Sequence, residues 1–200
     1  MPASAPRIPT RALALLAACL ALAPLPPARA QEAAKDAPDV RLGRDVVPTF
    51  QRLRLRLDPD KRSYSGLVHV ELKVANATDT IRFHAEGQKL THVTLRQGGD
   101  SVIVTRATGD HGLQTLGAAR RLAAGTATLD IEFTHLYGTR AVGLYKANRE
   151  GRGYLFTQFE SDDAREAFPC WDEPGFKFPY QVVLEVPAAL APRARATFAL

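Results

Sequence analysis

Histidine is the residue type in this sequence best suited to metal chemistry. A zinc ion that activates water is commonly held by two histidines one helical turn apart, in the pattern H-E-x-x-H, with a further carboxylate. None of the five histidines forms such a pair: they are His69, His84, His92, His111 and His135. The nearest arrangement, His84-Ala85-Glu86, lies in a strand-like stretch, so we interpret His84 as a structural residue. The sequence therefore predicts no metal site in this chain.

Thiol chemistry is the second possibility, because the chain has two cysteines, Cys19 and Cys170. Cys19 falls in an apolar amino-terminal run, and if that run is removed, Cys170 has no partner for a disulfide. A reactive thiol needs an exposed, electropositive site, which the sequence does not show. We predict that Cys170 is a buried, small apolar residue.

The amino terminus has the pattern of a secretory signal peptide. Two arginines precede the apolar run 12–23, and Ala28-Arg29-Ala30 offers an A-x-A cleavage site. The run is shorter than the roughly 20 apolar residues that a membrane-spanning helix needs. We expect cleavage after Ala30, a periplasmic or secreted protein and no stable membrane insertion. A lipid anchor at Cys19, within Leu16-Ala17-Ala18-Cys19, is the alternative.

The charge of the chain gives no indication of nucleic-acid binding. The sequence has 26 Lys and Arg against 21 Asp and Glu, a formal net charge of +5. Residues 1–30 contain three Arg and no acidic residue, so their removal leaves 23 basic against 21 acidic residues, or +2. A charge this small, without a basic run, excludes an electrostatic surface for nucleic acid.

In the remainder of the chain, apolar and polar residues alternate over many short stretches. This pattern indicates the strands that position the polar groups. In residues 52–57 arginines alternate with leucines, which is typical of an antiparallel strand with one buried face. The stretches 68–74 and 129–133 repeat this period, and shorter strand candidates are 81–83, 93–95, 102–104 and 182–186. Turn-forming clusters separate them, as at 58–60, 97–100 and 109–112. We predict an all-β, antiparallel β-sandwich or saddle-like domain.

The predicted organisation has three parts, with a signal peptide at 1–30, a flexible polar lead-in at 31–45 and the β-domain at 46–200. One short helical turn is predicted at 161–168, with Ser161 as its cap and Pro169 as its stop. Residues 194–200 look like the start of another strand with nothing after it to pair. We therefore expect the domain to be incomplete at its carboxyl end.

The segment 143–174 combines residue types that a plain sandwich does not need in that order. It contains Gly143-Leu144-Tyr145, then Thr157-Gln158-Phe159-Glu160, and then the run 163–174, D-A-R-E-A-F-P-C-W-D-E-P. This order resembles the amino-terminal domain of zinc aminopeptidases of the aminopeptidase N and puromycin-sensitive aminopeptidase type, the gluzincin metallopeptidases. The opening stretch Val47-Pro48-Thr49 fits the same family.

The resemblance implies roles for two side chains. Gln158 would line the pocket for the first side chain of a peptide, and Glu160 would hold the peptide's free amino terminus. An α-amino group is largely cationic at neutral pH, so a fixed carboxylate in a cleft would both bind it and disfavour substrates without it. Without the flanking motif, Glu160 would be interpreted as a solvated carboxylate, and Gln158 as a residue on the solvent-exposed face of a strand.

The resemblance also implies what lies outside this chain. Zinc would be bound in the full-length enzyme, which removes amino-terminal residues from peptides, whereas the H-E-x-x-H ligands and the family's G-A-M-E-N loop do not occur here. We expect the chain alone to bind no cofactor and to be inactive, with peptide amino termini and the missing catalytic domain as partners. The alternative is a secreted, non-catalytic β-sandwich binding module derived from that family.

Overall fold

The computed structural model describes residues 41–191. The predicted signal peptide, most of the predicted lead-in and the strand expected at 194–200 lie outside the described residues. Within the described range, no helix has both the length and the apolar character needed to cross a membrane.

Strands make up most of the described chain, which confirms the all-β prediction. They are β1 (Val46–Arg56), β2 (Ser63–Val74), β3 (Thr78–His84), β4 (Lys89–Gln97), β5 (Asp100–Val102), β6 (Val104–Thr108), β7 (Leu113–Leu122), β8 (Gly125–Leu136), β9 (Gly143–Arg149), β10 (Arg152–Gln158) and β11 (Tyr180–Glu185). The helical elements with defined bounds are two 3-10 turns, η2 (Asp110–Gly112) and η3 (Ala164–Glu166).

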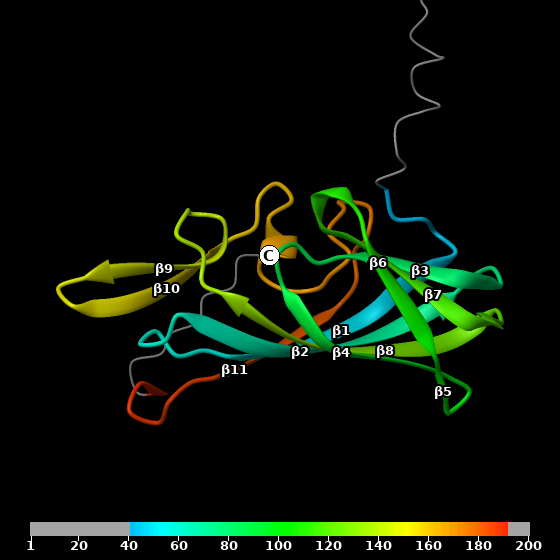
Figure 1. The fold of residues 1–200 in the computed structure, drawn as a ribbon, viewed down its shortest axis with the longest axis horizontal. Coiled ribbons are helices and arrows are strands. Elements are labelled where there is room, and N and C mark those ends of the chain that lie inside the picture. The colour runs from blue at the N-terminus through cyan, green and yellow to red at the C-terminus, as the bar shows by residue number, and fades with distance from the viewer. Residues whose placement is uncertain (1–40, 192–200) are drawn as a thin grey trace, which may run out of the picture. The chain divides into compact units, whose positions relative to one another are not determined.

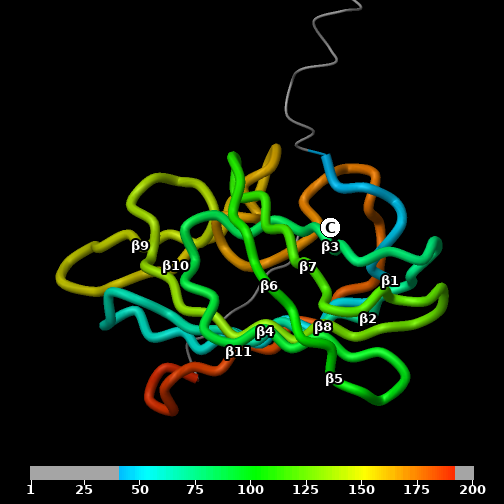
Figure 2. Tube along the Cα trace, turned by 45° about the vertical axis from the view of Figure 1, so that its right-hand side comes forward, coloured from blue at the N-terminus to red at the C-terminus, as the bar shows by residue number. Residues whose placement is uncertain are grey.

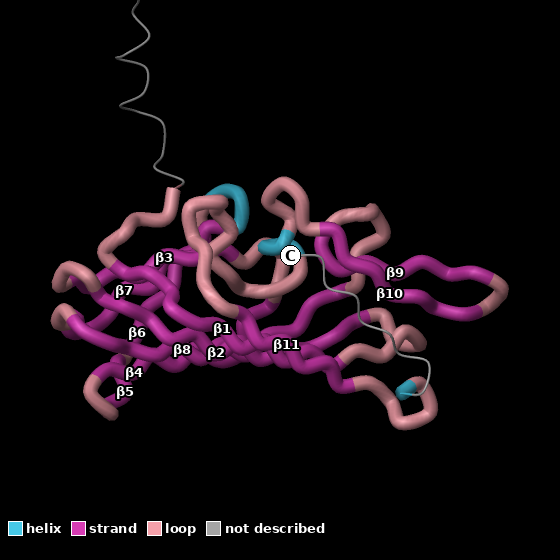
Figure 3. The backbone as a smooth tube through the Cα atoms, turned by 180° about the vertical axis from the view of Figure 1, so that it is seen from behind, coloured by secondary structure: helices cyan, strands magenta, loops and turns pink. Residues whose placement is uncertain are grey.

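The strands form three sheets (Figures 1 and 2). A six-stranded sheet has the order β11-β1-β2-β8-β4-β5, a three-stranded sheet has the order β3-β7-β6, and β9 and β10 form a separate hairpin. The pairings are antiparallel except that of β1 with β11, which is parallel. The hairpin extends from one end of the sheets, opposite the end that carries the β3-β7-β6 sheet (Figure 3).

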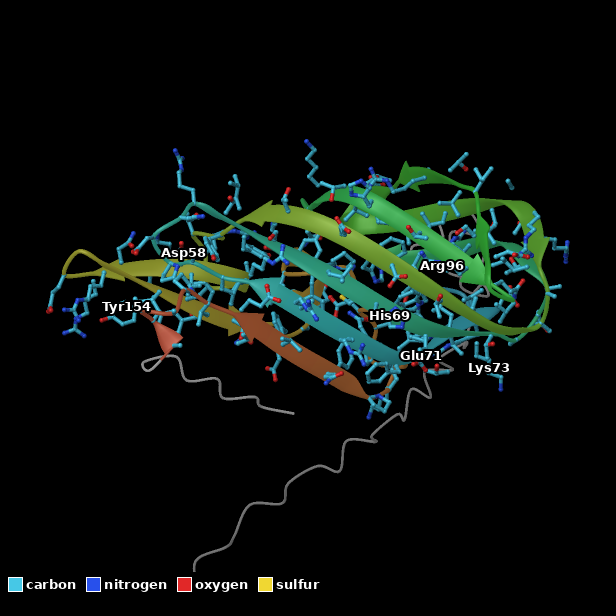
Figure 4. The ribbon with its side chains drawn as sticks, turned by 90° about the horizontal axis from the view of Figure 1, so that it is seen from below. Asp58, His69, Glu71, Lys73, Arg96 and Tyr154 are labelled. Atoms are coloured by element: carbon cyan, nitrogen blue, oxygen red, sulfur yellow. The ribbon has the colours of Figure 1, made fainter. Side chains whose placement is uncertain are left out.

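The core follows from the alternation of the strands. Leu53 and Leu55 of β1, and Val68 and Val70 of β2, point inward and are buried, while the arginines between the leucines face solvent. The outer face of the six-stranded sheet is polar, and Figure 4 shows His69, Glu71, Lys73 and Arg96 along it. Each fully buried aliphatic side chain contributes about 1.5–3 kcal/mol, so this inner face holds the layers together.

Two segments differ from the sequence prediction. Residues 102–104 were expected to form one strand, but β5 ends at Val102 and β6 begins at Val104 in a different sheet, with Ile103 78% exposed between them. The run of β-branched residues gave no local sign of this corner.

The second segment is 41–45, which composition places in the flexible lead-in. Leu42 is buried and its backbone N–H donates to Glu173 Oε1 at 2.6 Å. The guanidinium of Arg44 lies 4.0 Å from the centroid of the Phe176 ring. These contacts make 41–45 part of the folded domain.

Candidate functional site

Gln158 and Glu160 lie at the carboxyl end of the β9–β10 hairpin. The strands pair from Arg149 opposite Arg152 to Gly143 opposite Gln158. Both turn residues, Glu150 and Gly151, have positive φ values of 52° and 75°, as a two-residue hairpin turn requires. Gln158 is therefore the last residue of β10, and Glu160 follows it in the next turn.

The base of the hairpin is packed against the rest of the domain. Leu144 is buried, and Leu155 packs against the core from the opposite strand. Gly143 has a φ of 60°, and a Cβ at this position would lie 2.8 Å from the Cβ of Glu166 in η3. Only glycine allows β9 to approach η3 so closely. The end of the hairpin that carries Gln158 is thus fixed to the element that follows Glu160.

Arg165 holds the segment after Glu160 in place. This buried arginine donates from its backbone N and its Nε to Asp172 Oδ2, both at 3.1 Å. Its Nη2 donates to the backbone oxygen of Asp172 at 2.8 Å, and its Nη1 donates to that of His111 at 3.1 Å. One side chain therefore ties η3 to the turn at 172–174 and to η2. Asp172 in this turn therefore has a structural role.

The predicted helical turn is shorter than expected and is not capped by Ser161. Helix η3 covers only Ala164–Glu166, and Asp163 precedes it without a side-chain cap. The hydroxyl of Ser161 instead donates to Asp162 Oδ1 at 2.9 Å. The prediction of a Ser161 cap is wrong because the 3-10 turn begins two residues too late for that hydroxyl to cap it.

The turn at 158–161 brings the two predicted site residues together. Gln158 Oε1 accepts from the backbone N–H groups of Phe159 at 2.9 Å and Glu160 at 3.3 Å. The peptide bond between Glu160 and Ser161 is cis. The carboxylate of Glu160 is exposed and makes no hydrogen bond or ion pair with any residue of the range 41–191. Gln158 thus orders the turn, and the carboxylate oxygens of Glu160 have no partner in the part of the chain that the structure describes.

The large apolar residues beside this turn are structural. Phe168 and Trp171 are buried, and Phe176 packs against the core. The Phe159 ring meets the Phe168 ring edge to face at 5.7 Å. These contacts fix the turn at 158–161, which carries Glu160, to the hydrophobic core.

Cys170 and His84 also take the structural roles predicted for them. Their backbones form an isolated bridge, with His84 N donating to Cys170 O at 2.8 Å and Cys170 N to His84 O at 2.9 Å. Both side chains are buried, and burial raises the pKa of the Cys170 thiol well above its ordinary value. A protonated, inaccessible thiol is a poor nucleophile, so Cys170 is not part of a reactive site.

The residues that follow Glu160 are acidic. Asp162 and Asp163 lie in the same turn, and Arg165 Nη2 lies 4.0 Å from Asp162 Oδ2. Such a turn attracts a cation. Among residues 41–191, no three His, Cys, Asp or Glu side chains converge as a metal-ligand set. The arrangement can therefore bind a positively charged group, while the described part of the chain offers no metal-activated nucleophile.

The outer face of the hairpin was missed by the sequence interpretation. Tyr154 and Phe156 are exposed and alternate with the half-buried Gly153 and Leu155, so by the period of a strand they share a face with Gln158. The period of two in Tyr154-Leu155-Phe156-Thr157-Gln158 was the available signal.

Comparison with known proteins gives one family match and several aminopeptidases as relatives. Residues 47–193 match the model of the peptidase M1 N-terminal domain family. The chain is 32% identical to aminopeptidase M1-D of Oryza sativa subsp. japonica over 75% of its length, and 29% identical to a puromycin-sensitive aminopeptidase of Caenorhabditis elegans over 73%. It is 33% identical to a membrane alanyl aminopeptidase of Heliothis virescens over 74%. The matched regions cover 18%, 16% and 16% of these relatives, so the chain spans less than one fifth of their length.

Proposed function

This chain belongs to the peptidase M1 N-terminal domain family, and from that membership we propose that it anchors peptide amino termini for a zinc-dependent aminopeptidase. The observation that carries the proposal is the exposed carboxylate of Glu160, which bonds to no residue of the range 41–191 and lies in a turn that Gln158 orders and that Phe159 packs against Phe168. Exopeptidase specificity needs a group that recognises the charged end of a peptide, and Glu160 supplies one.

The chemistry of recognition is electrostatic. The α-amino group of a peptide has an ordinary pKa of about 7.7–8.0 and is mostly cationic at neutral pH. A carboxylate that accepts a hydrogen bond from a charged donor contributes about 1.5–3 kcal/mol, or roughly 10- to 100-fold in affinity. A blocked amino terminus loses this interaction and leaves the carboxylate unpaired. Gln158, which shares the turn, would line the pocket for the first side chain.

The zinc ion implied by the family does not fit the residues described here, because no set of three ligands converges among them. We infer that the ligands and the nucleophilic water belong to a different part of a longer polypeptide. On this proposal the 200-residue chain alone hydrolyses no aminoacyl arylamide when zinc is added.

The decisive experiment replaces Glu160 in the longer polypeptide. Glu160→Gln preserves the size of the side chain but removes its charge, so we expect KM for an aminoacyl arylamide to rise about 10- to 100-fold. The control is Glu150→Gln, an exposed glutamate at the hairpin tip, which should leave KM unchanged. Unchanged KM in Glu160→Gln, with discrimination against N-acetylated substrate intact, would contradict the proposal.

We also propose that the protein is exported. The motif at 28–30 and the charge of the first 30 residues support cleavage after Ala30 and a periplasmic or secreted mature form.

A further inference from the structure

The three-stranded sheet has an edge along β6, at the end of the domain opposite the β9–β10 hairpin (Figure 1). In the part of the chain that the structure describes, β6 pairs with β7 alone. It begins directly after the exposed corner residue Ile103, and residues 105–108 are exposed as well. Because this edge lies far from Glu160, a ligand bound along it would leave Glu160 accessible.

The pairing of β6 with β7 shows which backbone groups face outward. At one end Ala119 N donates to Ile103 O at 2.8 Å, and at the other end Gly109 N donates to Leu113 O at 2.8 Å. Hydrogen-bonded and non-hydrogen-bonded pairs alternate along an antiparallel ladder, so the odd-numbered residues of β6 bond to β7. The even-numbered residues therefore direct their N–H and C=O groups away from β7; they are Val104, Arg106 and Thr108.

These outward groups are available to an added strand. No residue of the range 41–191 bonds to the three N–H and three C=O groups. β6 contains neither lysine nor proline, the residues that commonly protect an exposed strand edge. An edge of this kind is a template on which an extended peptide can add as a further strand.

The side chains around the edge are basic. Arg106 is exposed in the middle of β6 and forms no ion pair with any residue of the range 41–191. Near the end of β7, Arg120 and Arg121 donate to backbone oxygens, those of Gln97 at 3.2 Å and Ala77 at 2.8 Å, and not to carboxylates. Opposite charges that face each other across two strands stabilise the pair, and like charges destabilise it. An added strand therefore binds best with an acidic residue opposite Arg106.

A cavity beside the edge indicates a second feature of the partner. It has a volume of about 290 Å³, and Ile103, Thr105 and Gly117 are among the residues that line it. The carboxylate in its lining, Asp79 Oδ1, accepts a hydrogen bond from Thr80 Oγ1 at 3.1 Å. Side chains alternate along a strand, so the residues next to the acidic one face the side that carries Thr105 and the cavity. Ile103 and the small residues of the lining favour an apolar side chain there.

A second copy of this chain fits the edge poorly. When two β6 strands pair antiparallel about a two-fold axis and use all their outward groups, Arg106 of one copy lies opposite Arg106 of the other. The like charges destabilise this register. A shift of two residues separates the arginines but leaves the outward groups of Thr108 unpaired in both copies. The charge of the edge thus favours a different, acidic partner.

We propose that β6 binds an extended acidic segment of another protein as an added antiparallel strand. The segment carries Asp or Glu opposite Arg106. Its next residue toward the carboxyl end is apolar, lies opposite Thr105 and enters the cavity beside Ile103. This interaction is additional to the recognition of peptide amino termini at Glu160 and does not depend on it.

Two matched peptides test the charge at the centre of the edge. T-V-E-L-T and T-V-K-L-T, both acetylated and amidated, present no cationic amino terminus to Glu160. In an NMR titration of the 200-residue chain, we expect the glutamate peptide to bind about 3- to 10-fold more tightly than the lysine peptide. Arg106→Glu should reverse this preference, because it reverses the charge of an exposed side chain. Equal binding of the two peptides, or binding of neither, would overturn the proposal.

Hydrogen exchange tests the direction of the added strand. Saturation with T-V-E-L-T should slow exchange at the amides of Val104, Arg106 and Thr108 at least about 10-fold, because only these gain a partner. The amides of Thr105 and Ala107 already bond to β7 and should not change. Protection of the outward amides that grows with protein concentration in the absence of peptide would overturn the proposal in favour of a second copy. Protection in a longer polypeptide alone would overturn it in favour of a segment of the same chain.

A proline substitution tests the backbone contribution. Thr108→Pro removes an outward N–H and leaves the bonds between β6 and β7 in place. The control is Thr108→Ala, which keeps this N–H and, like the proline variant, loses the hydroxyl that donates to Gln114 Oε1 at 3.1 Å. We expect T-V-E-L-T to bind Thr108→Pro about 3- to 10-fold more weakly than Thr108→Ala. Equal affinities in two folded variants would contradict strand addition.

Discussion

Two charged residues of the same segment, Glu160 and Arg165, are in opposite electrostatic situations. Arg165 is buried and its guanidinium is bonded to Asp172 and to the backbone of His111. Glu160 is exposed and its carboxylate is unpaired within the described range. Arg165 fixes the backbone of this segment, whereas the carboxylate of Glu160 has no described partner. Such a segment is suited to bind a cation, because binding costs little further conformational entropy.

Arg165 should be a principal source of stability for this segment. Arg165→Met leaves the Asp172 carboxylate, 14% exposed in its side chain, without its charged partner, so we expect the free energy of unfolding to fall by about 2–4 kcal/mol. The matched control is Arg56→Met, which removes a pair with Glu185 whose side chains are 70% and 38% exposed, and should cost less than about 1 kcal/mol. Urea denaturation of both variants measures the difference. Equal losses would show that the buried pair has no special role.

Among the elements, β2 shows how a glycine is accommodated inside a strand. The strand begins at Ser63, and Gly66 lies directly opposite Phe133 of β8. The Phe133 ring occupies the space that a side chain on residue 66 would fill, since a Cβ there would lie 2.5 Å from ring atoms. An aromatic ring over a strand glycine restores the packing that the missing side chain would supply.

This close packing predicts a specific sensitivity. Gly66→Ala forces the Phe133 ring to move, and overpacking of this kind costs about 1–3 kcal/mol. Gly43→Ala is the control, because a Cβ at residue 43 meets no atom within 4 Å. The two thermal midpoints should therefore separate, with Gly43→Ala at or near the value of the unmodified protein. A Gly66→Ala protein as stable as the control would mean that the ring moves aside freely.

The same elements show what a sequence can predict. The period of two located the inner faces of β1, β2 and β8, because alternation depends only on neighbouring residues. The parallel pairing of β11 with β1 depends on residues more than 120 positions apart, and no local pattern encodes it.

The candidate site also has a part that the local sequence indicates and a part that depends on the fold. The sequence could single out Gln158 and Glu160 as candidates because a contiguous motif carries them. The clamp between Arg165 and the backbone of His111 joins residues 54 positions apart, so only the fold could reveal it.

At the scale of the whole molecule, the excess of basic residues is concentrated in residues 1–30. The net charge of +5 falls to +2 when the three arginines of residues 1–30 are removed. A strongly acidic or basic surface would steer the domain toward charged macromolecules, and +2 is too small for that. On the proposed function, the negative turn at 160–163 would therefore act only on a ligand already close to it.

Export makes a prediction about the mature amino terminus. Signal cleavage needs small residues at the A-x-A positions, so the protein expressed in a Gram-negative host should begin at Gln31, outside the cytoplasm. Intact mass measurement of the periplasmic and culture fractions identifies this terminus. Replacing both small residues, Ala28→Leu with Ala30→Leu, should keep the precursor uncleaved, whereas Cys19→Ala should change nothing. A mature protein that begins at a lipid-modified Cys19 would replace the soluble form with an anchored one, and a cytoplasmic protein that retains residues 1–30 would refute export.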